Sequence, residues 1–89
     1  MLNAPCSDIA NIERVTRSRK HVCEDCVKVG SLWVHLRVCQ ECGGTRCCDE
    51  SPNRHARRHA KASGHPVIAS AEPGESWLYC FPDDVLMEY

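Results

Sequence analysis

Hydrophobic and polar residues alternate most regularly between positions 32 and 38 of the chain. The apolar members of this run share one face of an extended chain, and they are Leu32, Val34, Leu36 and Val38. Their period of two predicts a half-buried β-strand. The opposite face carries Trp33, His35 and Arg37, so a large aromatic ring is left exposed unless something covers or binds it.

Further strands are expected after this run. Residues 67–70 form a short apolar segment, and residues 76–81 alternate again after a turn at 72–75. The alternation separates an aromatic face, Trp77, Tyr79 and Phe81, from an apolar face, Leu78 and Cys80. Residues 45–48 are expected to add a short extended segment.

The main helix is expected over residues 51–63. Ser51 is a favourable N-cap, and Pro52 suits the first helical position. Gly64 stands where a helix C-terminus prefers glycine, and Pro66 follows soon after. Within this helix, His55 and His59 lie one turn apart and therefore share a face.

A shorter helix is expected within residues 6–15, where Ile9, Ile12 and Val15 recur at helical spacing after a capping Ser7 or Asp8. Together these elements predict an α+β fold, with an antiparallel β-sheet, one main helix (51–63) and a short N-terminal helix. The chain has 89 residues, so we expect a single domain over residues 1–89.

A domain of this size gains little stability from apolar burial alone, and small folds often add a metal or disulfides. The hydrophobic fraction of 43% includes eight cysteines, and aromatic residues make up only 6%. The N-terminal residues show no basic head followed by an apolar run, and no stretch is long enough to span a membrane. We therefore expect a cytoplasmic protein whose cysteines bind metal instead of forming disulfides.

Candidate metal ligands are concentrated between Cys23 and His65. They comprise two Cys-x-x-Cys pairs, a histidine pair four residues apart and three further residues: Cys23, Cys26, Cys39, Cys42, His55, His59, Cys47, Cys48 and His65. Thiolate and neutral imidazole are the ligands that zinc prefers, four at a time in a tetrahedron. Spacing alone allows two pairings, since the four cysteines of the two pairs could share one ion, or each pair could take two later ligands.

The formal net charge is −1, which gives the whole protein no general attraction to nucleic acid or to an anionic membrane. One predicted helix face is nevertheless basic, with Arg54, Arg57, Arg58 and Lys61. A nucleic-acid-binding zinc domain is therefore an alternative function, although a solvated charged face is the simpler interpretation. We expect a monomer.

The order of the ligands resembles the UBP-type zinc finger, a ubiquitin-binding module of some deubiquitinases and of a histone deacetylase. The residues that carry the resemblance are Cys23-x2-Cys26, Trp33, Cys39-x2-Cys42-x4-Cys47, His55-x3-His59, Gly64-His65-Pro66 and Trp77. Small stand-alone bacterial members are the most similar, through residues 33–37, 51–56 and 72–75.

This resemblance implies that the two pairs interleave and that two zinc ions are bound. One ion would be held by Cys23, Cys26, Cys47 and His55, and the other by Cys39, Cys42, His59 and His65. Cys48 competes with Cys47 for the first site, but the spacing from Cys42 matches the family at Cys47. Some members have a third site, for which this protein offers a degenerate set, Cys6, Asp8 and Cys80. Alternatively, Cys6 and Cys80 are buried as small apolar residues.

The expected zinc sites are closed by four protein ligands, whereas catalytic zinc keeps one position open. The sequence also has no His-Glu-x-x-His motif and no glycine-rich phosphate loop. We therefore predict a binding module and not an enzyme. An alternative is a thiol or zinc redox sensor that uses Cys48 or Cys80.

The resemblance implies a ligand groove for a free C-terminal protein tail, lined here by Trp33, Trp77 and Tyr79. The family keeps an arginine two residues after the cysteine that matches Cys47, and this protein has Asp49 there. A carboxylate at that position repels a ligand carboxylate where an arginine would form a bidentate pair. The resemblance therefore implies a protein or peptide C-terminal tail as partner, and Asp49 leaves the identity of that partner open.

Overall fold

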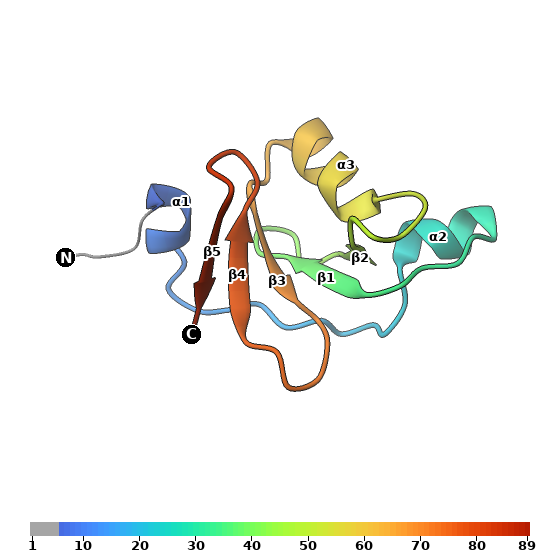
Figure 1. The fold of residues 1–89 in the computed structure, drawn as a ribbon, viewed down its shortest axis with the longest axis horizontal. Helices are drawn as coiled ribbons and strands as arrows, with labels where there is room; N and C mark the ends of the chain where they lie inside the picture. Colours follow the sequence, from blue (N-terminus) through green and yellow to red (C-terminus); the bar gives the residue numbers. More distant parts are fainter. Residues whose placement is uncertain (1–5) are drawn as a thin grey trace.

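The computed structural model describes residues 6–89 and contains a five-stranded antiparallel sheet in the order β2-β1-β3-β4-β5 (Figure 1). The strands are β1 (Leu36–Cys39), β2 (Thr45–Cys47), β3 (Val67–Ser70), β4 (Trp77–Cys80) and β5 (Val85–Glu88). The helices are α1 (Ser7–Ala10), α2 (Glu24–Val29) and α3 (His55–Ser63). The predicted α+β class is confirmed.

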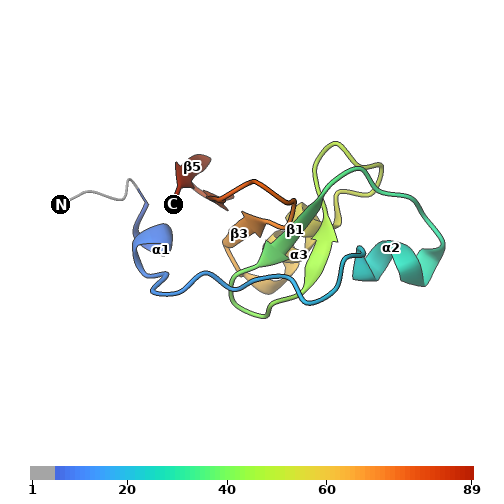
Figure 2. The same cartoon turned by 90° about the horizontal axis from the view of Figure 1, so that it is seen from below.

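The three helices take separate places around the sheet. Figures 1 and 2 show α1 beside β5 at one end of the molecule and α2 beyond β2 at the other. The main helix, α3, packs against β1 and β2, which places it over the same half of the sheet that α2 adjoins. One half of the sheet therefore carries most of the segments that hold cysteine and histidine.

Buried apolar residues form two small clusters. The first joins α1 to the sheet and contains Cys6, Ile9, Val38, Val67, Ala69, Leu78 and Cys80. The second lies near α2 and contains Cys23, Cys26, Leu36 and Cys47, with Trp33 and Ala71 packed against it. Three of the four buried residues of the second cluster are cysteines, so apolar burial alone gives this half of the fold little stability.

The strand predicted over 32–38 begins only at Leu36, and the prediction is corrected for residues 32–35. Leu32 is 81% exposed and Val34 is 52% exposed, so the alternation does not face a core there. The Val34 N–H donates to the Ser51 Oγ (2.8 Å), and the Leu32 carbonyl oxygen lies 3.7 Å from the Cys26 Sγ. These bonds wrap the segment around the second cluster instead of pairing it with β2.

The main helix begins at His55 and not at Ser51. Ser51 and Pro52 therefore precede the helix, and the buried Ser51 hydroxyl accepts the Val34 N–H instead of a helix N–H. The N-cap position is Arg54, in the left-handed conformation (φ 49°), and the His55 N–H donates to the Cys47 Sγ (3.2 Å). The predicted C-terminal glycine is confirmed, since Gly64 is left-handed with φ 79°.

Two elements have no counterpart in the sequence prediction. The first is the helix α2, which starts within the Cys23–Cys26 pair, where the Cys23 Sγ accepts the Cys26 N–H (3.3 Å) as a helix cap. Gly30, with φ 68°, ends that helix. The second missed element is β5, which pairs with β4 at the edge of the sheet.

Other expectations agree with the structure more closely. Strands β3 and β4 and the short β2 fall within the predicted ranges. Trp77 and Tyr79 are half-buried while Leu78 and Cys80 are fully buried, as the alternation predicts. The N-terminal helix is shorter than the expected range, since it covers only Ser7–Ala10. Its N-cap is Cys6 and not Ser7 or Asp8, and no side chain caps it.

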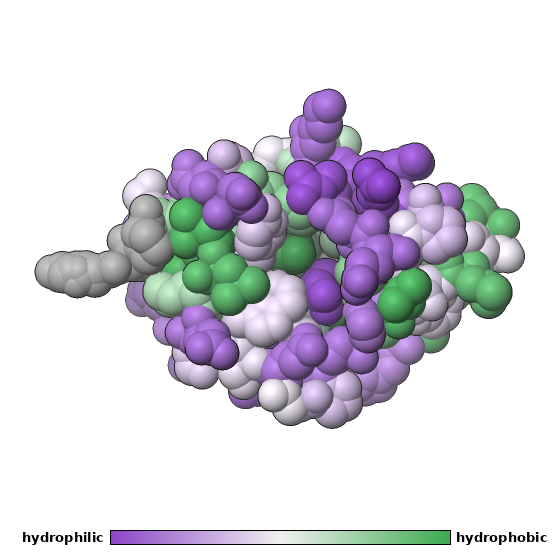
Figure 3. Space-filling model, viewed as in Figure 1, coloured by the Kyte–Doolittle hydropathy of each residue, from purple (hydrophilic) through white to green (hydrophobic). Residues whose placement is uncertain are grey.

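Apolar side chains also remain on the surface. Val27 and Val29 of α2 are exposed, and Figure 3 shows apolar residues at that end of the molecule. Within residues 6–89, no helix has both the length and the apolar character that crossing a bilayer requires.

Candidate metal centres

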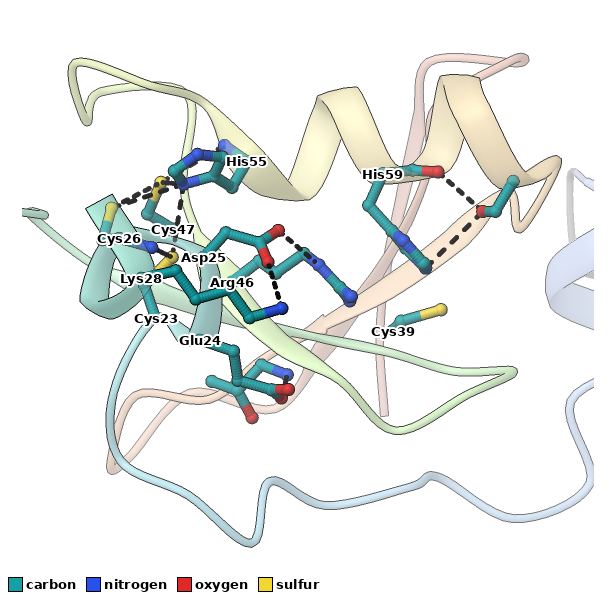
Figure 4. Close-up of polar contacts among 12 residues, drawn as sticks. Cys23, Glu24, Asp25, Cys26, Lys28, Cys39, Arg46, Cys47, His55 and His59 are labelled. Carbon is teal, nitrogen blue, oxygen red and sulfur yellow. Dashed lines mark hydrogen bonds and ion pairs between the residues drawn. The ribbon is translucent and has the colours of Figure 1, made fainter. Parts of the chain in front are cut away.

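Three elements contribute to the first candidate centre (Figure 4). Cys23 and Cys26 come from the start of α2, Cys47 from the end of β2 and His55 from the start of α3. The structure brings these four predicted ligands together, with the potential donor atoms all within 4.8 Å of one another. The fold therefore gathers one Cys-x-x-Cys pair with two residues that follow the other pair in the sequence.

The distances in this centre suit a tetrahedral zinc ion. The His55 Nδ1 lies 3.5 Å from the Cys23 Sγ, 3.3 Å from the Cys26 Sγ and 3.5 Å from the Cys47 Sγ. The Cys26 and Cys47 Sγ atoms are 3.8 Å apart, which is far beyond a disulfide bond. Typical zinc–ligand bond lengths in a regular tetrahedron require roughly 3.5 Å for sulfur–nitrogen and 3.8 Å for sulfur–sulfur edges.

The chemistry of the first centre also favours a cation. Its three cysteines are fully buried. In the metal-free protein, burial and the hydrogen bond with Cys23 raise the pKa of the Cys26 thiol to about 12. A bound dication favours the thiolate form and reverses this effect. Backbone N–H groups of Cys26 and His55 already point at sulfur atoms, as they do around metal thiolates.

The second candidate centre joins the end of β1 to α3. Cys39 ends β1, Cys42 lies in the following turn, His59 is in α3 and His65 follows Gly64. The His65 Nδ1 lies 3.5 Å from the Cys39 Sγ and 3.3 Å from the His59 Nε2, which is itself 3.4 Å from the Cys42 Sγ. These edges also match a zinc tetrahedron, for which two nitrogens are roughly 3.3–3.4 Å apart.

The second centre is more exposed than the first, and its surroundings shift the pKa values of its ligands in different directions. Burial, Arg46 and His65 lower the pKa of His59, which keeps its ring neutral. Burial raises the pKa of Cys39. Burial acts in the same direction on Cys42, but the Gly44 N–H, Cys39 and Arg46 lower the pKa of that thiol overall.

Arg46 lies between the two centres (Figure 4). Its Nε donates to the Asp25 Oδ2 (3.0 Å), and its Nη1 lies 4.0 Å from the Cys42 Sγ. Asp25 belongs to the helix that carries a ligand of the first centre. The guanidinium thus connects the surroundings of both centres through one side chain.

A third cluster contains the predicted degenerate set and one additional residue. The Cys80 Sγ lies 3.6 Å from the Asp8 Oδ2 and 3.7 Å from the Asp83 Oδ2, and Cys6 completes the group. Sequence reasoning missed Asp83, although its position three residues after Cys80 repeats the spacing of the two cysteine pairs. Burial, and then Cys6, raise the pKa of Cys80 to about 12 in the absence of metal.

Cys48 is separate from the first centre. Its Sγ lies 3.6 Å from the Ser51 Oγ and groups with His35 and Glu50. Neighbouring residues of an extended segment point to opposite faces, so Cys47 and Cys48 cannot both reach Cys23 and Cys26. The structure likewise separates the two Cys-x-x-Cys pairs, which would have to meet if they shared one ion.

A groove lies between α3 and the aromatic face of β4, with a cavity of about 200 Å3. Trp77, Tyr79 and Asp49 line it, as predicted, and so do Arg37 and Arg57. Trp33 does not line it, because this side chain packs against the buried cysteine cluster near α2. Arg57 was not predicted here, because its approach to β4 depends on how α3 packs against the sheet.

The basic helix face predicted from the sequence is partly neutralised. Arg57 forms an ion pair with Asp49, while Arg54, Arg58 and Lys61 are exposed. Three exposed cations thus remain at this helix, in a protein with net charge −1.

Comparisons with known proteins agree with the geometry. Residues 23–88 match the profile of a family described as "Zn-finger in ubiquitin-hydrolases and other protein". The solution NMR structure of protein RPA1320 from Rhodopseudomonas palustris is similar, with a TM-score of 0.82 and 44% sequence identity. The match covers 98% of the present sequence and 84% of that protein. No curated protein sequence matches.

Proposed function

The chain belongs to the family of zinc fingers found in ubiquitin-hydrolases and other proteins, and from this premise we propose that it uses zinc to build a groove that binds a protein or peptide tail. Zinc is the cofactor, and several cysteine and histidine clusters could hold it. Zinc-finger modules of this kind generally bind partners and do not catalyse reactions. The groove beside β4 is the site we assign to the partner.

The observation that carries this proposal is the half-exposed aromatic wall of the groove. Trp77 and Tyr79 line the cavity, and Arg37 and Arg57 lie at the same site. Binding sites typically combine an apolar concave surface with a few convergent polar groups that fix the orientation of the ligand. A short extended peptide end suits a cavity of about 200 Å3.

In this proposal, the metal ions position the groove without taking part in chemistry. We assign one zinc ion to Cys23, Cys26, Cys47 and His55, and a second to Cys39, Cys42, His59 and His65. Four protein ligands fill a tetrahedron and leave no position for substrate. The ions would fix the end of β1, the end of β2 and the first turns of α3. These segments support one side of the groove.

Tryptophan fluorescence tests the groove. The protein has two tryptophans, so Trp33→Phe leaves Trp77 as the single reporter. We expect a concentration-dependent change when a peptide with a free Gly-Gly end is added to this variant. Trp77→Phe, followed by calorimetry, should weaken binding, while Trp33→Phe should bind as the wild type. Absence of any signal at millimolar peptide or with ubiquitin would refute the tail-binding groove.

We also propose a third, weaker zinc site formed by Cys6, Asp8, Cys80 and Asp83. Two sulfur and two carboxylate oxygen atoms within 4.8 Å support it, since carboxylate oxygen is a zinc ligand in many sites. Native mass spectrometry should then find three zinc ions in the wild type and two in Asp83→Asn. A count of two in the wild type at saturating zinc would mean that Cys6 and Cys80 serve only as buried apolar residues.

A further inference from the structure

We propose that Arg57 is the receptor for a carboxylate group of the ligand and that Asp49 is an internal carboxylate which occupies Arg57 until the ligand displaces it. This inference rests on the proposed groove and names the chemistry that the groove recognises. It assigns the anion-binding role to α3 and makes Asp49 a competitor that controls affinity.

The contact between the two side chains has the geometry of ligand recognition. The Arg57 Nε lies 3.1 Å from the Asp49 Oδ1 and 2.9 Å from the Oδ2, and the Arg57 Nη2 donates to the Oδ2 at 2.7 Å. A guanidinium that meets both oxygens of a carboxylate is the geometry by which arginine selects carboxylates. Asp49 thereby shows which chemical group fits this position of the groove.

Arg57 is held in place by more than its partner. Its Cζ lies 4.8 Å from the centre of the Phe81 ring, and Phe81 in turn meets Tyr79 edge to face at 5.2 Å. Arginine on an aromatic face keeps its hydrogen-bond donors free at the edge of the guanidinium plane. The Phe81 ring is therefore a second contact that holds Arg57 in the groove, in addition to Asp49.

Arg37 is the other arginine of the groove, but it already binds other groups of the protein. Its Cζ lies 4.7 Å from the Trp77 ring centre, and its Nη1 donates to the Leu36 carbonyl oxygen (3.0 Å). A backbone carbonyl of the same sheet cannot leave when a ligand arrives. Arg37 also lies 4.0 Å from the Glu75 Oε1 and 3.5 Å from the Ser70 Oγ, so three groups share this guanidinium. Arg57, in contrast, meets both oxygens of one exposed carboxylate, and the Asp49 side chain can rotate away.

The Asp49–Arg57 pair is also accessible. The two side chains are 45% and 47% exposed, respectively, so water and solutes reach both of them. Exposed ion pairs contribute little to stability because solvent screens them and side-chain ordering opposes them. A ligand carboxylate that also gains aromatic contacts in the groove can therefore replace Asp49. The same carboxylate chemistry could come from the free C-terminus of a polypeptide or from an acidic side chain.

The test compares Asp49→Asn, Arg57→Gln and the control Arg58→Gln, which removes a neighbouring exposed charge outside the groove lining. Each variant is titrated with three peptides by calorimetry: one with a free C-terminus, its C-terminal amide, and the amide carrying a glutamate as the last residue. Asp49→Asn should tighten binding of a free carboxylate roughly 3- to 10-fold, as expected when a self-blocked site is released. Arg57→Gln should weaken it at least roughly 10-fold, and Arg58→Gln should match the wild type.

Comparison of the three peptides distinguishes a failure of this inference from a failure of the proposed groove function. Equal binding of the acid and amide peptides by all variants would leave the groove function intact and overturn the role of Arg57. A preference for the glutamate-ended amide would assign the site to acidic side chains, and a preference for the free terminus would assign it to polypeptide ends; both support the carboxylate receptor. Unchanged affinity in Asp49→Asn would refute internal competition.

A second measurement does not depend on peptide binding. N-acetylglycine is titrated into 15N-labelled Asp49→Asn, and the Arg57 Nε–H resonance is followed, with that of Arg58 as reference. A saturable shift of the Arg57 signal alone would support a carboxylate receptor even if the peptides fail and the tail-binding function is lost. No shift at high millimolar concentration would overturn the inference.

Discussion

At the residue scale, Ser51 joins two segments that both reach the first candidate metal centre. Its buried hydroxyl accepts the Val34 N–H (2.8 Å) and lies beside the Cys48 Sγ (3.6 Å). The sequence shows only that serine is a common helix N-cap. It does not show that the backbone N–H of Val34 donates to this hydroxyl in the folded protein. The hydroxyl therefore serves a contact between distant segments and not the local helix.

Ser51→Ala is expected to reduce the free energy of unfolding of the zinc-loaded protein by about 1–3 kcal/mol. The physical reason is that the part-buried Val34 N–H loses its acceptor, and an unsatisfied buried donor costs about this much. Urea denaturation followed by circular dichroism measures the change. Ser76→Ala, at an exposed position, is the control and should stay within roughly 0.5 kcal/mol of the wild type.

Cys47 and Cys48 are neighbours whose sulfur atoms belong to different clusters. We expect Cys47→Ser to lose one equivalent of zinc and to unfold at a lower temperature, because a hydroxyl is a much poorer zinc ligand than a thiolate. Cys48→Ser should keep the wild-type stoichiometry in native mass spectrometry. The reverse result, with zinc lost only from Cys48→Ser, would contradict the assignment of Cys47 to the first centre.

At the scale of elements, α3 links the two centres, because His55 and His59 leave it one turn apart. A substitution that destabilises this short helix should therefore weaken zinc binding at both centres. The helix has nine residues, which is too short to be stable by itself in water. Its stability must come from packing on β1 and β2 and from the metal ligands that it carries.

Arg58→Gly tests this linkage, since Arg58 lies between the two histidines and is exposed. Glycine lowers helix stability by about 1 kcal/mol, which corresponds to a factor of about 5 in the local opening equilibrium. We expect zinc release to a chromogenic chelator to accelerate for both ions, while Arg58→Ala, which removes the same charge, should release zinc at the wild-type rate. Acceleration of only one ion would show that the centres are independent.

The elements differ in how far the sequence determines them. Strands β3 and β4 could be predicted because their polarity pattern agrees with the side chains that the sheet buries. The pattern at 32–35 is equally regular, but its hydrogen bonds go to Ser51 and around the first centre, so no strand forms. Helix α2 could not be predicted, because the cap that starts it is a cysteine sulfur.

The same distinction applies to the candidate sites. Ligand order and spacing, with the family resemblance, were enough to predict which cysteines and histidines the fold brings together. The groove was predicted only in part, since Trp77 and Tyr79 share one strand face, whereas Arg57 reaches them from another element. Contacts between elements depend on how α3 packs across the sheet, and a local pattern contains no information about that.

At the scale of the whole molecule, the fold has one modest apolar cluster and one cluster made mostly of cysteine. The first includes Ile9, Val38, Val67 and Leu78, and it resembles the core of a small β-sheet protein. The second would bring several sulfur atoms into contact without favourable partners if no cation were bound. The half of the molecule around α2 and α3 should therefore depend on metal much more than the half around α1.

Removal of zinc is accordingly expected to unfold the protein. Structural zinc contributes about 10–16 kcal/mol to small metal-dependent folds, which exceeds the stability of an 89-residue domain. With excess EDTA, the NMR amide signals of β1, β2 and α3 should collapse to unfolded positions, and zinc should restore them. Acidification should act in the same direction, because protons compete with zinc for thiolates. Full retention of dispersed signals in EDTA, with the metal shown to be absent, would contradict the dependence of this fold on zinc.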